Sequence, residues 1–183
     1  MKWWESMNKG IFHKIFGALT YLCLLVLCTF LIVEFVGQCT EVEGMSMYPT
    51  LEDQENLILD KITYRFRNPE RYDIVVFPPP YKENTYYIKR IIGLPGETVQ
   101  IIDGEVYIDG EKLDVDYGYE KMESAGIAEE ALLLGEDEYF VLGDNRNHSL
   151  DSRAAEVGTV KRENIIGRAF LRIWPLYRLG WIE

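Results

Sequence analysis

The sequence has few of the residues that build metal sites, disulfide frameworks and phosphate-binding loops. Its 183 residues include three cysteines and two histidines, with neither zinc-site spacing nor a disulfide pattern. No glycine-rich loop follows a predicted strand, which argues against a nucleotide-binding α/β fold. The formal net charge is −11, which argues against a nucleic-acid-binding face. We therefore expect no metal, no cofactor and no nucleic-acid partner.

One long hydrophobic run is present near the N-terminus. Residues 15–33 contain no charge, and as a helix they would span about 28 Å, close to the roughly 30 Å hydrocarbon thickness of a bilayer. Lysines precede the run and glutamates follow it, which places the N-terminus in the cytoplasm by the positive-inside rule. We predict a cytoplasmic tail over 1–14, a transmembrane anchor over 15–36 and an extracytoplasmic domain over 37–183.

Two processing alternatives compete with a retained anchor. The apolar core of a cleavable signal peptide is usually about 7–15 residues long and ends at small residues. The run here is longer and is followed by Glu-Phe-Val-Gly-Gln at 34–38, which favours retention. Lipidation of Cys39 is disfavoured because Gln38 does not fit a small-residue cleavage site.

The region after Gly37 has the pattern of short β-strands. Asp-Gly pairs at 103–104 and 109–110 separate short alternating runs and predict a β-meander. Residues 114–137 are acidic and less regular, so we expect a surface insertion there, with a short helix over 124–134. The fold class is therefore predicted to be mostly β, one antiparallel β domain behind a single transmembrane helix. The predicted strands are 56–60, 73–77, 86–92, 99–102, 105–108, 111–113, 138–142 and 164–173.

Ser46 lies just beyond the anchor, in the stretch Gly44-Met-Ser-Met-Tyr-Pro-Thr-Leu51. A serine hydroxyl is a poor nucleophile until a neighbouring base removes its proton. One candidate base is His148, which lies near Asp144 and Asp151 and would complete a Ser-His-Asp triad.

Lys89 is the other candidate base. In the predicted strand 86–92 its same-face neighbours are Tyr87 and Ile91, and burial among them would lower the lysine pKa enough for the neutral amine to accept a proton. Arg90 has equally apolar neighbours, so periodicity alone does not show which of the two points inward. Arginine keeps its proton and cannot be the base. The alternative for Lys89 is a solvated lysine at a strand edge.

The polar loop 143–153 holds acids, arginines and serines. We expect Asp144 and Asp151 to pair with Arg146 and Arg153, and a serine hydroxyl of the loop to hold the lysine amine in place. The alternative is a solvated turn with weak surface ion pairs.

Four stretches, in this order behind a single anchor, closely resemble the bacterial type I signal peptidases, in their short single-anchor form typical of Gram-positive bacteria. The resemblance implies the family's mostly β catalytic domain, shared with self-cleaving repressors of the LexA type. It also implies removal of signal peptides from exported preproteins, after small residues at the first and third positions before the bond. The four stretches are 44–51, 71–77, 87–96 and 143–153.

The resemblance implies roles for individual residues. Ser46 matches the nucleophile of a Ser–Lys dyad, Lys89 its general base, and Met47 a residue that lines the substrate pocket. Ser149 matches the serine that hydrogen-bonds the lysine. His148 is not expected to act in catalysis, because the family's base is a lysine. The residues that match the ion-pair network behind the site are Asp144, Arg146, Asp151 and Arg153.

Two positions depart from the family pattern. Gly44 stands where some relatives carry a serine that helps bind the oxyanion, so the oxyanion would depend on backbone N–H groups, first on that of Ser46. Tyr72 stands where a glycine is common, so the shape of that turn is not predicted.

The expected partners are signal peptides of exported preproteins and the lipid bilayer. The C-terminal side chains Trp174, Leu176, Tyr177 and Trp181 would either touch the membrane interface or pack in the ordinary way. Two alternative functions remain open: a specialised relative dedicated to pilin or other surface-protein assembly, and a non-catalytic membrane-tethered peptide-binding β domain.

Overall fold

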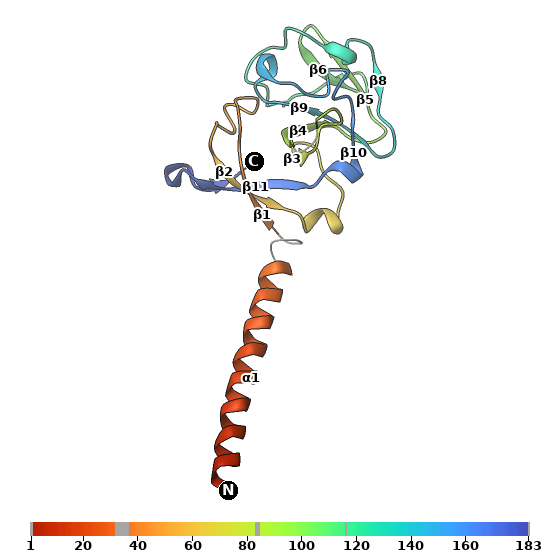
Figure 1. Ribbon diagram of the computed structural model, residues 1–183. Coiled ribbons are helices and arrows are strands. Elements are labelled where there is room, and N and C mark those ends of the chain that lie inside the picture. The colour runs from red at the N-terminus through yellow and green to blue at the C-terminus, as the bar shows by residue number, and fades with distance from the viewer. Residues whose placement is uncertain (1, 32–36, 83–84, 116, 183) are drawn as a thin grey trace. The chain divides into compact units, whose positions relative to one another are not determined.

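The computed structural model describes residues 2–31, 37–82, 85–115 and 117–182, with side chains from residue 13 onward except at residue 31. The chain divides into two compact units, Met1–Gly37 and Gln38–Glu183. Figure 1 traces the chain through both units.

The first unit is one helix, α1 (Lys2–Leu31). Its window His13–Phe30 has a mean hydropathy of 1.7 and no buried residue, so by length and composition it could cross a membrane. Thr20 and Thr29 donate their hydroxyls to carbonyls one turn back, which satisfies these polar groups within the helix. The helix already begins at Lys2, inside the predicted tail. Residues 32–36, the end of the predicted anchor, lie outside the described residues.

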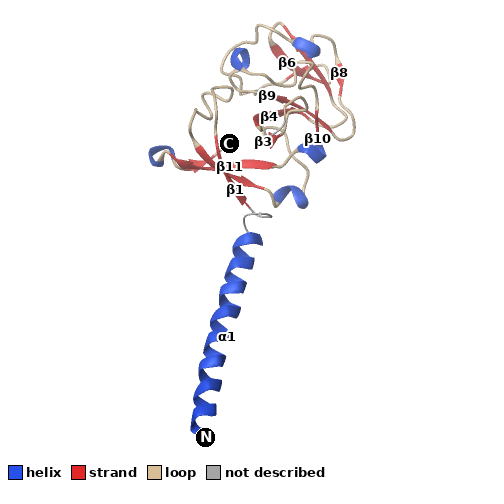
Figure 2. Cartoon of the chain, in the orientation of Figure 1, coloured by secondary structure: helices blue, strands red, loops and turns tan. Residues whose placement is uncertain are grey.

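The second unit is built from two antiparallel β-sheets with short 3₁₀ turns between the strands (Figure 2). The predicted mostly β fold class is confirmed. The larger sheet has the order β1 (Gly37–Glu41), β2 (Asn56–Asp60), β11 (Gly167–Trp174), β3 (Ile74–Phe77), β4 (Tyr87–Gly93), β9 (Glu138–Leu142) and β10 (Val160–Lys161), with β12 (Gly180–Trp181) on β11. The smaller sheet has the order β7 (Glu111–Lys112), β6 (Glu105–Ile108), β5 (Thr98–Ile102) and β8 (Leu132–Leu133). The 3₁₀ turns are η2 (Thr63–Arg65), η3 (Gly126–Ala128), η4 (Arg146–His148), η5 (Arg162–Asn164) and η6 (Leu176–Arg178).

The predicted β-meander is confirmed as β5, β6 and β7. Both residues of each Asp-Gly pair have positive φ, +50° and +73° at the first turn and +52° and +84° at the second. These are the backbone angles that a tight two-residue hairpin requires and that Asp-Gly tolerates.

The predicted helix over 124–134 is wrong. That segment forms the short turn η3 and the strand β8, and β8 pairs with β5. Ala128 and Leu134 are buried in the core between the sheets, so residues 114–137 are not simply a surface insertion. Although the segment 114–137 is acidic, a few of its apolar residues complete the core.

Strand β4 runs through the centre of the larger sheet, and its register positions the site. It pairs with β3 from Tyr87 to Arg90, but with β9 only at Arg90, Ile91 and Gly93. Within the described residues, the first half of β4 therefore has one edge without a strand partner. The second half is buried on both faces, with Ile91 and Ile92 both fully inaccessible.

Candidate active site

Ser46 and Lys89 meet at the unpaired half of β4. The Lys89 Nζ lies 2.8 Å from the Ser46 Oγ and 3.0 Å from the carbonyl oxygen of Ile88. In its ammonium form the lysine donates to both oxygens. In its neutral form it could instead accept the proton of the serine hydroxyl. The two residues are 43 positions apart in the sequence, and the fold brings them into hydrogen-bonding distance.

The surroundings of Lys89 favour the neutral amine. The side chain is 3% exposed, and its Nζ lies 5.1 Å from the centre of the Tyr87 ring. Burial lowers the pKa of Lys89 to about 8, against a smaller opposing effect of the Asp151 and Asp144 carboxylates. A lysine with this pKa is partly neutral near neutral pH, as a general base must be.

The backbone of the Ser46 turn, residues 44–51, is fixed at several points. The side chains of Met47 and Leu51 are buried, 1% and 0% exposed, and anchor the turn in the core. Asn145 holds it from the polar loop, because its backbone N–H donates to the Ser46 carbonyl (3.1 Å) and its Nδ2 to the Met45 carbonyl (3.0 Å). Asn145 was not predicted as a site residue, although it lies within the polar loop 143–153.

The Ser46 N–H donates to no carbonyl or side chain among the described residues, so it is available to a developing oxyanion. Gly44, two positions earlier, has φ +86°, and its own N–H donates to Asp53 Oδ1 at 2.7 Å. A serine at position 44 would be strained in this left-handed conformation. Tyr72 likewise has φ +74°, a left-handed conformation that glycine adopts more readily than tyrosine.

A buried ion pair joins β4 to the polar loop. Arg90 Nε donates to Asp144 Oδ1 at 3.0 Å and Arg90 Nη2 to Asp144 Oδ2 at 2.8 Å, and both side chains are fully buried. Thr50 also donates its hydroxyl to Asp144 at 2.6 Å. The partner of Asp144 is thus Arg90, not the expected Arg146. Periodicity had left the burial of Arg90 open, and an arginine that is buried needs a carboxylate.

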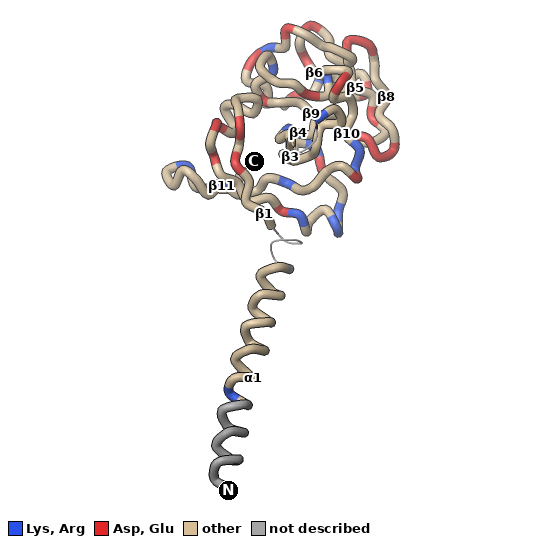
Figure 3. The backbone as a smooth tube through the Cα atoms, in the orientation of Figure 1, with Lys and Arg blue, Asp and Glu red and all other residues tan. Residues whose placement is uncertain are grey.

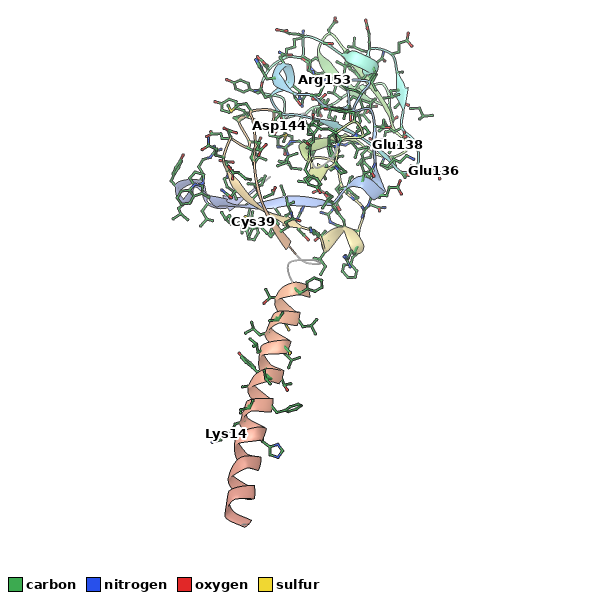
Figure 4. All side chains as sticks on the ribbon, in the orientation of Figure 1. Lys14, Cys39, Glu136, Glu138, Asp144 and Arg153 are labelled. Carbon is green, nitrogen blue, oxygen red and sulfur yellow. The ribbon has the colours of Figure 1, made fainter. Side chains whose placement is uncertain are left out.

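The expected pair of Asp151 and Arg153 is formed, with Nε 2.8 Å from Oδ1 and Nη2 2.9 Å from Oδ2. Asp151 also accepts the N–H of Gly143 at 3.0 Å, and Arg146 donates its Nε to the Gly143 carbonyl at 3.1 Å. These contacts all join residues of the polar loop 143–153 to one another, so they fix its conformation. Figure 4 labels Asp144 and Arg153 of this loop on the side of the β domain that carries η3 and η4.

Two other residues of the loop, Ser149 and His148, bear on which group is the base, and only Ser149 is placed differently from expectation. The Ser149 Oγ is buried against the Cα of Gly143 and has no hydrogen-bond partner among the described residues, so the expected bond to Lys89 is not formed. The His148 side chain is 73% exposed, and its Nδ1 faces Glu120 at 3.9 Å. An exposed histidine turned toward Glu120 does not form a Ser46 triad.

Two arginines of the C-terminal segment contact the Ser46 turn and the neighbouring Glu55, and neither was predicted as a site residue. Arg172 Nη1 lies 2.8 Å from Glu55 Oε1, and Arg178 Nη1 lies 3.0 Å from the same oxygen. The two arginines also donate to the carbonyl oxygens of Thr50 (3.4 Å) and Pro49 (3.3 Å). These residues are more than 100 positions apart in the sequence, so no local pattern could have predicted the contact.

A cavity of about 480 Å³ opens onto the Ser46–Lys89 pair. The segment 40–43 forms one wall and residues 85–88, with the unpaired edge of β4, form the other. Met47, Val76 and Leu150 add apolar surface. Within the described part of the chain, no three His, Cys, Asp or Glu side chains gather as a metal site.

A cleft along an open strand edge, with a serine and a buried lysine at its base, is the arrangement of a peptidase that binds its substrate in extended form. The family described as signal peptidase, peptidase S26, matches residues 15–174, and the chain belongs to this family. It is a serine peptidase.

The named relatives agree with this assignment. The chain is 44% identical to a "Probable signal peptidase I-2" of Synechocystis over 80% of this chain and 67% of that protein. It is 34% identical to a "Signal peptidase I" of Bacillus licheniformis over 93% of this chain and 94% of that protein. A crystal structure of a signal peptidase I from Enterococcus faecalis is 38% identical and covers 56% of this chain and 97% of its own, with a TM-score of 0.46.

Proposed function

We propose that the protein is a membrane-bound serine endopeptidase that removes signal peptides from exported preproteins, after small residues at the first and third positions before the cut. The observation that carries the proposal is the 2.8 Å contact between the Ser46 hydroxyl and a lysine that is 3% exposed. Family membership and the relatives' names support the reaction class and the substrate.

The proposed mechanism uses Ser46 and Lys89 as a dyad. The neutral Lys89 amine takes the serine proton while Oγ attacks the scissile carbonyl, and the Ser46 N–H stabilises the oxyanion. The resulting ammonium then protonates the leaving amine as the peptide bond breaks, which leaves an acyl-enzyme. Lys89 next takes a proton from a water molecule while the hydroxide attacks the acyl carbonyl. As the ester bond breaks, the Lys89 ammonium returns the proton to the Ser46 Oγ, which releases the signal peptide and restores the neutral amine and the serine hydroxyl.

The substrate would add to the open edge of Tyr87–Lys89 as an extended strand. Main-chain hydrogen bonds to an unpaired strand edge give affinity, and alternate side chains then point into the cavity. Met47 and the other apolar residues of the cavity would line the pockets for the small residues. The ion pairs of Asp144 and Asp151 with their arginines would not touch the substrate. They would hold the polar loop 143–153, which in turn fixes the Ser46 turn.

The anchor would be α1, with the N-terminus in the cytoplasm and the β domain extracytoplasmic, as the lysines before the apolar run favour. The C-terminal aromatics would touch the bilayer rather than pack in the core. Trp174, Tyr177 and Trp181 are 53%, 84% and 71% exposed, and aromatic side chains prefer the membrane interface.

The test is cleavage of preproteins by the full chain in proteoliposomes. A panel with small or large residues at the two positions before the cut should separate efficient from poor substrates. Ser46→Ala should abolish cleavage, whereas the exposed Ser124→Ala should not. Wild-type cleavage by Ser46→Ala would contradict the proposal, and cleavage of only one narrow substrate class would favour a specialised assembly peptidase.

A further inference from the structure

The charge of the β domain is strongly polarised along its length. Residues 97–138 contain 14 acidic and two basic residues, a net charge of −12, whereas the rest of the β domain, residues 37–96 and 139–183, contains 14 acidic and 14 basic residues. In Figure 3 the acidic residues crowd the smaller sheet and its loops, while lysines and arginines follow η2 and the neighbouring β11. The domain therefore has an acidic end, at the smaller sheet, and a basic end, at η2.

The loop 61–67 at the basic end exposes two large apolar side chains. Phe66 is 85% exposed, the highest value among the large apolar side chains that the structure describes, and Ile62, one helical turn earlier, is 39% exposed. Lys61, Arg65 and Arg67 alternate with them in the sequence. Exposed aromatic and aliphatic side chains interleaved with basic ones are typical of surfaces that bind anionic lipid headgroups.

The backbone of this loop is held firmly, so the exposure of Phe66 is built into the fold. Asp60 accepts the N–H groups of Ile62 and Thr63, both at 3.0 Å, which fixes the start of the turn. Tyr64 points inward, is 6% exposed and donates its hydroxyl to Asp73 at 2.8 Å. With Tyr64 fixed in the core, the neighbouring Phe66 is left on the outside.

Nearby carboxylates do not cancel the basic character of this end. Asp73 lies 3.2 Å from Arg67 and 3.4 Å from Arg168, and Asp60 lies 4.0 Å from Arg168. Glu70 pairs with Arg67 at 3.2 Å, and Glu163 lies on the adjoining turn η5. Lys161 and Arg162 beside η5 add two positive charges.

The basic end is also where the chain arrives from the anchor. Val42 and Glu55 share a backbone hydrogen bond of 2.8 Å, as do Gln54 and Val42, so β1 and β2 run antiparallel and β1 begins where β2 ends. β2 leads directly into the loop 61–67. Only residues 32–36 separate α1 from β1, and five residues reach at most roughly 18 Å. The start of β1 and the loop 61–67 therefore lie at the same end of the β1–β2 pair.

We propose that the loop 61–67 is an interfacial contact with anionic phospholipid, with Phe66 and Ile62 in the headgroup region and the basic residues on the lipid phosphates. The acidic end of the domain is then repelled from the same surface, and the two effects together orient the β domain on the membrane. The proposal rests on the proposed anchoring of α1 in a bilayer, and it names a lipid class and a surface.

The test uses an environment-sensitive fluorophore on a single cysteine at position 66, in the full chain with Cys23, Cys28 and Cys39 replaced by alanine. Phe66→Cys should show a blue shift in vesicles that contain phosphatidylglycerol, a smaller one in phosphatidylcholine, and a loss of the difference in high salt. Leu133→Cys is the matched control, because Leu133 is 68% exposed at the acidic end and should show no shift. Ile62→Cys serves if the first variant does not fold.

Equal blue shifts at positions 66 and 133, or equal shifts at position 66 in the two lipids, would overturn the proposal. A shift that disappears when the protein is diluted to one copy per vesicle would also overturn it, in favour of contact with a second copy. Lys61→Glu with Arg65→Glu should reduce the shift at position 66. Preprotein cleavage, measured on the same samples in detergent, reports separately on the peptidase.

Discussion

Replacement of Lys89 by methionine should inactivate the enzyme and stabilise its fold at the same time. Methionine is similar in size and apolar, so it removes the charge without leaving a cavity. The ordinary lysine pKa of 10.5 falls to about 8 in this site. At about 1.4 kcal/mol per pH unit, the buried ammonium costs the folded state roughly 3 kcal/mol. Loss of the contacts to Ser46 and Ile88 offsets part of this, which leaves a gain of roughly 1–3 kcal/mol at pH 7.

The sign of the pH dependence follows from the same shift. The folded pKa lies below the unfolded one, so the unfolded chain binds more protons between about pH 8 and 10.5. The penalty on the wild type is therefore complete below pH 8, shrinks through this window and vanishes above it. The advantage of Lys89→Met should be greatest at neutral pH and absent by about pH 10.5.

The assay is guanidinium unfolding of the full chain in detergent, at pH 7 and again near the upper end of the window, beside preprotein cleavage. Lys82 is the matched control, since it lines the same cavity but is exposed. Lys82→Met should change stability by less than about 0.5 kcal/mol and keep activity. A Lys89→Met protein that is less stable than the wild type at pH 7 would refute the reasoning, because the lysine would not then be a destabilised buried ammonium.

The remaining predictions concern the surroundings of the dyad. His148→Ala should keep most of the cleavage activity, because that side chain is exposed; a loss above tenfold would revive the triad. Asp144→Asn should lower the free energy of unfolding by about 3–5 kcal/mol, since it removes the carboxylate charge from a fully buried ion pair with Arg90, and chemical denaturation measures this. Arg178→Gln should lower kcat more than it raises KM, because the contact of Arg178 with the Pro49 carbonyl holds the Ser46 turn in place. Arg178→Lys should recover part of the loss in kcat. Arg168→Gln is the control, because Arg168 lies on the same C-terminal segment but pairs with Asp60 and Asp73. It should leave both kcat and KM unchanged.

Local patterns in the sequence predicted the meander and the strand that carries Lys89. Asp-Gly pairs encode their turns in two adjacent residues, and alternation encodes a strand within a few. The choice between Lys89 and Arg90 was not encoded in this way, because both sides of β4 are apolar. In the structure both side chains are buried, one against Ser46 and the other against Asp144.

Partners across long sequence separations could not be predicted. Asp144 was expected to pair within its own loop, but the arginine it binds lies 54 positions earlier, on β4. The contacts of Arg172 with Glu55 span 117 positions. Such pairs depend on strand order, which hydrophobic periodicity does not determine. The short helix over 124–134 failed for a related reason, since β8 exists only because β5 offers it an edge.

The most direct test of the dyad is to trap the acyl-enzyme on its serine. The full chain in detergent is treated with an acylating β-lactam-like or lipopeptide inhibitor, digested and mapped by mass spectrometry, beside Lys89→Met. We predict one adduct on Ser46 in the wild type, formed faster as the pH rises toward 8, and none in folded Lys89→Met. An adduct on another residue, or acylation of Lys89→Met at the wild-type rate, would contradict the assignment of Ser46 as nucleophile and Lys89 as its base.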